Sequence, residues 1–384
     1  MRPYRFETTP VLVAGAGSVH ALAPELLARG AASVLVVTDP GLMAAGLVMP
    51  IVERCRSAGL TLSVFSEVAA DPPEAVVLAA ANAARASGAD TVIGLGGGSA
   101  MDTAKLAALL AGTPQALEAI YGIGQAKGPR LRLVQVPTTA GTGSEVTPIA
   151  IVTTASHEKK GVVSPLLLAD LAVLDADLTL GLPAAVTAAT AIDAMVHAIE
   201  AYTSRLKKNP ISDALAEQAL RLLFSNLPRA LADGQNRTAR GALLEGAMLA
   251  GMAFANAPVA AVHALAYPLG GHFHVPHGLS NALVLAPVLR FNLSAAIPEY
   301  AALGRLLDPT LHTADDSAAA EAFVAMMSQL VSTMPFAQRL ADVGVTSNDL
   351  EMLAHDAMAV QRLLINNPKD VTFEDALEIY RSVA

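Results

Sequence analysis

The segment TVIGLGGGSAMDTAKLAALLAG, residues 91–112, decides the fold of this chain. An apolar run with β-branched residues is followed by three consecutive glycines, Gly96 to Gly98, and then by a stretch rich in Ala and Leu. This order predicts a strand, a tight turn and a helix, which is the building unit of parallel α/β domains. Backbone N–H groups at such a turn can approach an anion, and the helix N-terminus adds a partial positive charge. The segment therefore predicts an α/β domain with a phosphate-binding loop.

The glycine loop matches neither GxxxxGK[ST] nor GxGxxG, because Ser99 stands where the last glycine of the second motif would fall. We expect Ser99 to cap the following helix while it also donates to a phosphate. The alternative is a glycine turn that only permits tight packing of the strand against the helix. The spacing favours phosphate binding over this alternative.

Outside this segment, short β-branched runs alternate with Ala-rich stretches as far as about residue 180. We predict one buried, central parallel sheet with strands at 33–39, 61–68, 91–97, 131–137, 149–153 and 171–175. From Pro183 onward, apolar positions recur three and four residues apart, which predicts helices, and Pro183 suits a first helical turn. We therefore expect an α/β dinucleotide-binding domain over 1–180 and an all-helical domain over 181–384.

Composition excludes several classes of protein. The 384 residues exceed the usual size of one hydrophobic core, so two domains are expected. No apolar run approaches the roughly 20 residues of a membrane span, and the N-terminus lacks a secretory pattern, so we expect a soluble, cytoplasmic protein. A net charge of −9 with scattered basic residues argues against nucleic acid as a partner. The single cysteine, Cys55, excludes an internal disulfide and has no catalytic partner beside it.

Two further polar features are expected at one edge of the sheet. The segment PTTAGTGSEVTP, residues 137–148, follows a predicted strand and is rich in hydroxyls and glycines. Ligands of open α/β sheets bind beyond the carboxyl ends of the strands, so this segment and the glycine loop could share one ligand. Asp39 ends another predicted strand, where a carboxylate can accept hydrogen bonds from an adenosine ribose and would repel the extra phosphate of NADP. The alternatives are an ordinary loop and an ordinary helix cap.

Four candidate metal ligands are divided between two segments of the helical half. Asp193 and His197 in AIDAMVHAIEAY are four residues apart, so they project from one face of a helix. His263 and His277 stand in HALAYPLGGHFHVPHG. One carboxylate with three imidazoles suits Fe²⁺, Zn²⁺, Mn²⁺ or Co²⁺ and does not resemble a closed thiolate site. Two more histidines stand in the second segment, so spacing alone does not choose the partners of Asp193 and His197.

Four segments together resemble the iron-containing (group III) alcohol dehydrogenases: GGGSAMDTAK (96–105), PTTAGTGSEVTP (137–148), DAMVHAIEAY (193–202) and HALAYPLGGHFHVPHG (263–278). The resemblance runs in order from about residue 5 to 295. It implies the dehydroquinate synthase-like fold of that family, with an N-terminal dinucleotide-binding domain, a helical C-terminal domain, and a cleft between them for nicotinamide and a catalytic metal. It also implies a homodimer or a larger assembly.

The resemblance assigns roles to individual residues. It implies that eight residues contact the cofactor in addition to Asp39: Gly97, Gly98, Ser99, Asp102, Thr138, Thr139, Thr142 and Lys160. It selects His263 and His277, rather than His272 and His274, as the metal ligands that complete the set with Asp193 and His197.

The chain departs from the family pattern at Tyr267. Many members carry a further histidine there, one helical turn after His263, where it is thought to help move protons. A phenol, with an unperturbed pKa near 10, is a poorer proton carrier at neutral pH than an imidazole. Either Tyr267 only shapes the pocket, or His272, His274 or solvent takes this role.

The implied reaction is reversible hydride transfer between a small alcohol and NAD, with Fe²⁺ or Zn²⁺ as the catalytic ion. A maleylacetate-reductase-like enzyme works without metal, and the intact set of four ligands argues against it. A glycerol-dehydrogenase-like zinc enzyme is a further alternative, although GGGSAMDTAK and PTTAGTGSEVTP fit the iron group better. From a different class, a non-catalytic nucleotide-binding scaffold is favoured only by the missing histidine at position 267.

Overall fold

The computed structural model describes residues 3–155 and 158–384, which form two compact units. The α/β unit comprises Glu7–Leu182 and Gly234–Met248. The helical unit comprises Pro183–Asp233, Leu249–Ala384 and a short N-terminal segment that ends at Phe6.

The segment Gly234–Met248 groups with the α/β unit although it follows two long helices. Two of its arginines bond residues near the end of Glu7–Leu182. Arg237 pairs with Asp177 at 2.6 Å, and Arg240 donates to the Leu182 carbonyl at 3.2 Å. The first half of helix α8 (Arg237–Asn256) is therefore tied to the α/β unit.

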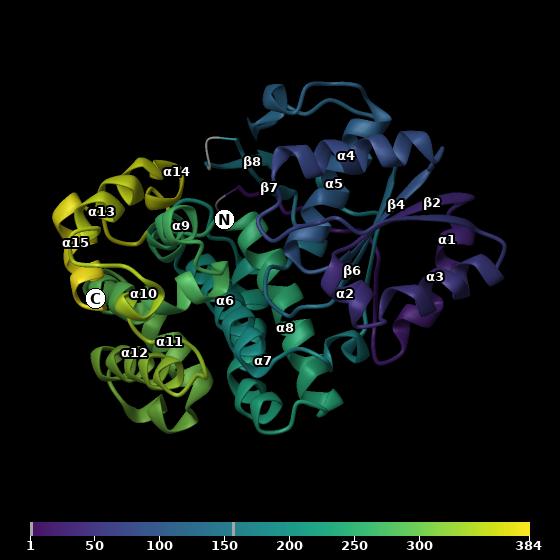
Figure 1. Cartoon of the computed structure of the whole chain (residues 1–384). Coiled ribbons are helices and arrows are strands. Elements are labelled where there is room, and N and C mark those ends of the chain that lie inside the picture. Colours follow the sequence, from purple (N-terminus) through teal and green to yellow (C-terminus); the bar gives the residue numbers. More distant parts are fainter. Residues whose placement is uncertain (1–2, 156–157) are drawn as a thin grey trace. The chain divides into compact units, whose positions relative to one another are not determined.

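Six strands form the central sheet of the α/β unit in the order β1-β9-β6-β4-β2-β3, and all neighbouring pairs are parallel. Their bounds are Leu12–Ala14 (β1), Ser33–Val37 (β2), Thr61–Phe65 (β3), Thr91–Gly96 (β4), Arg132–Pro137 (β6) and Leu171–Leu174 (β9). Figure 1 shows helices on both faces of this sheet. The predicted parallel α/β architecture is confirmed.

The two faces of the sheet have separate apolar cores. On one face, the strands pack against α4 (Glu74–Ala86) and α5 (Gly98–Gly112). On the other, they pack against α1 (Leu22–Ala28) and α3 (Val48–Ser57). Because both faces are covered, β4 is buried along its whole length, which explains the continuous apolar run at 91–96.

The prediction that 149–153 belongs to the central sheet was wrong. This strand, β7 (Ile149–Thr153), pairs antiparallel with β8 (Lys159–Val163) in a second sheet whose other edge is β5 (Gly122–Ile123). Only alternate residues of β7 are buried, as in a sheet covered on one face. Two of its three half-exposed positions, Ile149 and Ile151, are also apolar, so the alternation was hidden in the sequence.

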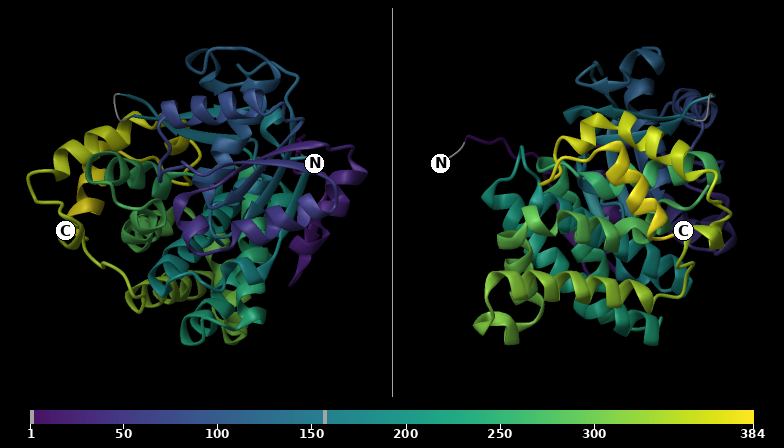
Figure 2. Two further views of the ribbon diagram at one scale, coloured as in Figure 1. Left: turned by 45° about the vertical axis from the view of Figure 1, so that its right-hand side comes forward. Right: turned by 90° about the vertical axis from the view of Figure 1, so that its left-hand side faces the viewer.

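The helical unit contains ten helices, counting α8, and no strand follows β9 in the part of the chain that the structure describes. Their bounds are Ala184–Thr203 (α6), Pro210–Ala232 (α7), Arg237–Asn256 (α8), Ala261–Phe273 (α9), His277–Asn292 (α10), Ile297–Leu307 (α11), Asp316–Ser332 (α12), Leu350–Ala359 (α13), Gln361–Leu364 (α14) and Phe373–Arg381 (α15). Pro183 occupies the N-cap of α6 rather than its first turn. Within this unit, Figure 2 shows the yellow C-terminal helices beside the green helices, and α13 packs against α9.

Helix α6 is the core helix of this unit. By length and composition it could cross a membrane, but 78% of its apolar window is buried inside the structure. Helix α9 follows α8 at a bend of 105°. The candidate metal ligands lie on α6, α9 and α10.

Candidate functional site

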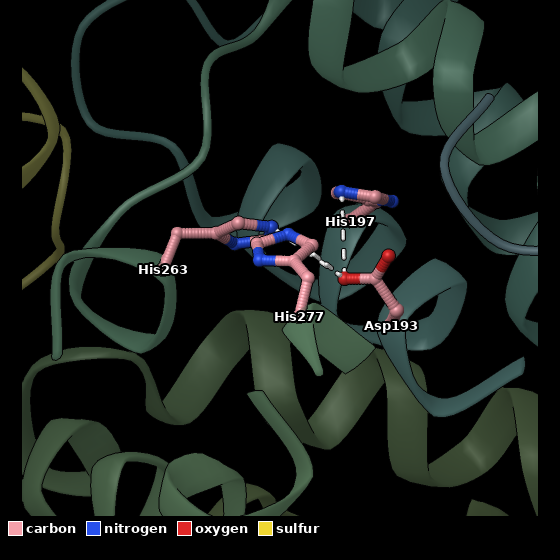
Figure 3. A group of neighbouring side chains, drawn as sticks. All are labelled: Asp193, His197, His263 and His277. Atoms are coloured by element: carbon pink, nitrogen blue, oxygen red, sulfur yellow. Dashed lines mark ion pairs between the residues drawn. The ribbon is translucent and has the colours of Figure 1, made fainter. Parts of the chain in front are cut away.

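The structure brings the four predicted ligand residues together. Asp193 and His197 lie one turn apart on α6, His263 lies in the first turn of α9, and His277 is the first residue of α10. One ligand atom from each residue lies within 4.8 Å of all the others. Figure 3 shows the three imidazoles turned toward one carboxylate oxygen, Asp193 Oδ1. This oxygen lies 3.8, 3.7 and 3.5 Å from the Nε2 atoms of His197, His263 and His277.

The neighbouring histidines do not join this group. His272 Nε2 lies 2.6 Å from Asp356 Oδ2 in an exposed pair. His274 is exposed and ends α9 with a left-handed backbone, φ 53°. The geometry thus makes the choice that spacing alone left open.

The donor set fits a divalent cation. An ion about 2.1 Å from each ligand atom would hold those atoms roughly 3 to 4.2 Å apart, which matches the distances from Asp193 Oδ1. Burial raises the pKa of Asp193, but the imidazoles of His197, His277 and His263 and the Asn281 amide outweigh it and hold this pKa below its usual range. The buried Asp193 carboxylate therefore favours its ionised form, the form in which it can bind a cation.

Ring packing fixes the two most buried imidazoles. His197 is stacked on Phe254 at a centroid distance of 4.3 Å and on His263 at 4.8 Å. His263 and His277 meet at a tilt of 50°. Phe254 comes from the second half of α8, so three helices and the start of α10 set the ring positions.

Sequence reasoning missed Glu200, which orients His263. Glu200 Oε2 lies 2.7 Å from His263 Nδ1, and Glu200 Oε1 accepts a hydrogen bond from the Val262 backbone N–H at 2.7 Å. The carboxylate thus ties the first turn of α9 to α6, and it favours the tautomer of His263 whose Nε2 is free for an ion. Glu200 lies three residues after His197 on the same helix, so helical spacing could have identified it.

Asn281 is the second residue that was missed, one turn after His277 on α10. Its Nδ2 donates to Asp193 Oδ1 at 2.6 Å and lies 3.3 Å from Nε2 of both His263 and His277. Its Oδ1 is buried and has no hydrogen-bond partner in the described part of the chain. The amide therefore forms part of the polar wall around the ligand atoms.

In the α/β unit, the glycine loop is too crowded for a side chain at Gly96, where a Cβ atom would lie 2.7 Å from Ala100 Cβ, and at Gly98. A Cβ atom on Gly98 would lie 2.8 Å from Thr142 Cγ2, and one on Gly97 would lie 3.5 Å from Thr139. A Cβ atom on Gly96 would lie 3.5 Å from Asp39 Oδ2. Three residues predicted to bind the cofactor, Asp39, Thr139 and Thr142, are thus brought to the glycine loop.

The helix-cap alternative for Asp39 is present in the structure. Asp39 caps α2 (Pro40–Ala44), and its Oδ1 accepts from the Leu42 N–H at 3.0 Å. The expectation that Ser99 caps α5 was wrong, because the helix already begins at Gly98 and its N-cap is Gly97. The Ser99 hydroxyl instead accepts from the Asp71 N–H at 3.3 Å.

Buried charges hold the 137–148 segment in place. Asp102 Oδ1 accepts from the Ser144 hydroxyl at 2.6 Å, and its Oδ2 accepts from the Ile151 N–H at 2.9 Å. Lys105 is fully buried; its Nζ lies 3.7 Å from Asp102 and donates to the Ile149 carbonyl at 2.6 Å. Burial lowers the pKa of Lys105 to about 8, against the opposing effect of Asp102. Asp102 thus positions the loop, a role that its motif did not reveal.

Of the two remaining predicted cofactor residues, Thr138 lies at the glycine loop and Lys160 lies on a different strand. Thr138 is buried, and its N–H donates to the Gly96 carbonyl at 3.0 Å, which joins the two loops. Lys160 lies on β8 and pairs with Glu158 at 2.7 Å.

Two family models match the chain. The model described as iron-containing alcohol dehydrogenase matches residues 9–176, and the C-terminal model of the Fe-containing alcohol dehydrogenase family matches residues 187–384. The chain is 38% identical to long-chain-alcohol dehydrogenase 1 of Geobacillus thermodenitrificans, over 97% of this chain and 95% of that protein.

Solved structures of related proteins agree with this match. A structure of 1,3-propanediol oxidoreductase superposes with a TM-score of 0.96 at 33% identity and covers 100% of both chains. A structure of sulfoacetaldehyde reductase from Bifidobacterium kashiwanohense in complex with NAD⁺ gives a TM-score of 0.90 at 27% identity, over 100% of this chain and 99% of that chain.

Replacing Glu200 tests the orientation of His263. Without its acceptor, the imidazole of the Glu200→Ala variant is free to turn or change tautomer, so we expect the Fe²⁺ dissociation constant to rise about 10- to 100-fold. Glu200→Gln keeps an acceptor oxygen and should show a smaller rise. Competition with a chelator measures both. Thr203→Val on the same helix is the control, and Glu200→Ala protein that binds Fe²⁺ as tightly as the parent would contradict this role.

Proposed function

Because the chain belongs to the iron-containing alcohol dehydrogenase family, we propose that it is an NAD-dependent alcohol dehydrogenase. It transfers a hydride reversibly between a small alcohol and the nicotinamide ring. The convergence of Asp193, His197, His263 and His277 supports this function most strongly, because the four residues come from three helices and together can hold one metal ion.

The four residues would hold Fe²⁺, with Zn²⁺ as the other candidate ion. When bound, the ion supplies Lewis-acid chemistry, which lowers the pKa of an alcohol and polarises an aldehyde carbonyl. A single carboxylate among neutral imidazoles leaves a dication with net positive charge, so the protein keeps the electrophilic character of the site. Three of the four side chains are buried, and this excludes water from all but the His277 side.

The α/β unit would hold NAD. Gly97 and Gly98 let backbone N–H groups approach the diphosphate, and the N-terminus of α5 adds its partial positive charge. Asp39 would accept a ribose hydroxyl through Oδ2, since Oδ1 already caps α2. This carboxylate would also repel a 2′-phosphate, which favours NAD over NADP.

Other predicted residues would contact the cofactor or support it. The proposed hydroxyl contacts are Ser99, Thr138, Thr139 and Thr142, and Lys160 would add a positive charge. Asp102 would act mainly by holding the 137–148 segment, as its bonds to Ser144 and Ile151 indicate.

The metal-independent alternative is not favoured, because all four ligand residues are present and converge. We also propose that the protein acts in the cytoplasm as a homodimer. The match to the family models supports the proposed homodimer.

Removal and return of the metal test this function. Protein stripped with a chelator should lose NADH-dependent reduction of short aldehydes, because nothing then polarises the carbonyl. Anaerobic addition of Fe²⁺ should restore it, and parallel addition of Zn²⁺ identifies the better ion. Full activity in metal-free protein, confirmed by elemental analysis, would contradict the proposed mechanism.

Tyr267→Phe tests whether the phenol carries protons. The Tyr267 ring lies 6.1 Å from the His277 ring and packs under the Arg362 guanidinium, so we expect it to shape the site rather than to relay protons. Turnover should then stay within about twofold of the parent, since only a hydroxyl is lost. Tyr380→Phe is a matched control, because it removes a hydroxyl that donates to the Leu265 carbonyl of α9, the helix that carries Tyr267. A loss of several hundredfold in Tyr267→Phe alone would show that the phenol is catalytic.

A further inference from the structure

The four ligand residues differ in their access to solvent. The His277 side chain is 41% exposed, whereas those of Asp193, His197 and His263 are 2–5% exposed. Among these four residues, His277 is therefore the one that solvent reaches most easily. Side chains beside His277 are placed where the far end of a substrate could extend.

Tyr267 lies beside His277, and Arg362 lies over the ring of Tyr267. The rings of Tyr267 and His277 meet at a centroid distance of 6.1 Å. The guanidinium carbon of Arg362 lies 5.8 Å from the centroid of the Tyr267 ring. Stacking on this half-buried ring limits the directions that the guanidinium can take.

The backbone beneath Arg362 is fixed. Arg362 lies on the short helix α14, where the next two residues, Leu363 and Leu364, are buried. The buried Asn366 side chain donates to the Arg362 carbonyl and to the Val259 carbonyl, both at 3.1 Å. Val259 lies just before α9, so Arg362 is anchored to the helix that carries His263.

The positive charge of Arg362 is not neutralised by an ion pair among the described residues. Two acidic residues on either side of it in the sequence already have partners: Asp356 lies 2.6 Å from His272, and Asp370 pairs with Arg205 at 2.7 Å. The exposed Arg362, stacked on the Tyr267 ring, thus presents a cation close to the exposed member of the ligand group, His277.

We propose that Arg362 selects substrates that carry an anionic group, a carboxylate or a sulfonate, at the end remote from the reacting carbon. The planar fork of a guanidinium can bond two oxygens of such a group at once. A neutral alkyl end gains nothing from this cation, and a quaternary ammonium end is repelled by it. This inference rests on the proposed function, because the dehydrogenase reaction defines which carbon of the substrate reacts.

Matched aldehydes test the proposal with the Fe²⁺-loaded enzyme and NADH. The aldehydes share one chain length and end in a methyl, a carboxylate, a sulfonate or a trimethylammonium group. In the parent enzyme, kcat/KM should be higher for the anionic aldehydes than for the neutral one. Arg362→Ala should lower this anionic-to-neutral ratio about tenfold, mainly through KM, since a charge-assisted hydrogen bond is lost.

Two further variants sharpen the result. Arg362→Glu should reverse the preference toward the trimethylammonium aldehyde. Arg290→Ala removes an exposed arginine of α10 that pairs with Glu321, and it should leave the ratio unchanged. An unchanged ratio in Arg362→Ala would overturn the selection by Arg362 while the proposed function stood. Failure of every variant and the parent to reduce any of the aldehydes would overturn both.

Discussion

The helical unit must stabilise one buried carboxylate, Asp193, on its core helix. A charge on the core helix α6 is costly unless it is compensated, and here three imidazoles and the Asn281 amide surround its Oδ1. A second carboxylate, Glu200, is buried about two turns farther along α6 and bonds to His263 and the Val262 N–H. Both carboxylates of α6 contact His263 of α9. The positions of the candidate ligands and the packing of these two helices therefore depend on each other.

In the α/β unit, the glycine loop has no side chains over its backbone at Gly96 to Gly98. The diphosphate that we propose to bind there would need this access to the backbone N–H groups. Two charged residues one turn apart on α5 hold the segment that follows β6. Asp102 accepts from the Ser144 hydroxyl, and Lys105 donates to the Ile149 carbonyl. The residues that we propose to contact NAD and the residues that hold them in place are thus adjacent in the sequence.

Sequence reasoning recovered the parts of this arrangement that depend on local periodicity. The continuous apolar run of β4 indicated a strand covered on both faces, and the four-residue spacing of Asp193 and His197 indicated a shared helix face. It failed where the outcome depends on long-range packing. The pairing of β7 with β8 is set by a second sheet that leaves no distinct pattern in 149–153.

The ligand set shows the same limit. Spacing could not separate His263 and His277 from His272 and His274, because the turn between α9 and α10 decides which rings face α6. Glu200 and Asn281 lie at helical spacing from known candidates, but polar residues at such spacing are common on helices. Only their hydrogen bonds distinguish them from ordinary buried side chains.

The identity and position of the ion test the central claim most directly. Crystals of Fe²⁺-loaded protein, measured at the iron absorption edge, should give one anomalous peak in this unit. We expect it about 2.0–2.2 Å from Asp193 Oδ1 and from the Nε2 atoms of His197, His263 and His277. A peak bound by His272 or His274, or no peak between these four side chains at full iron content, would contradict the account.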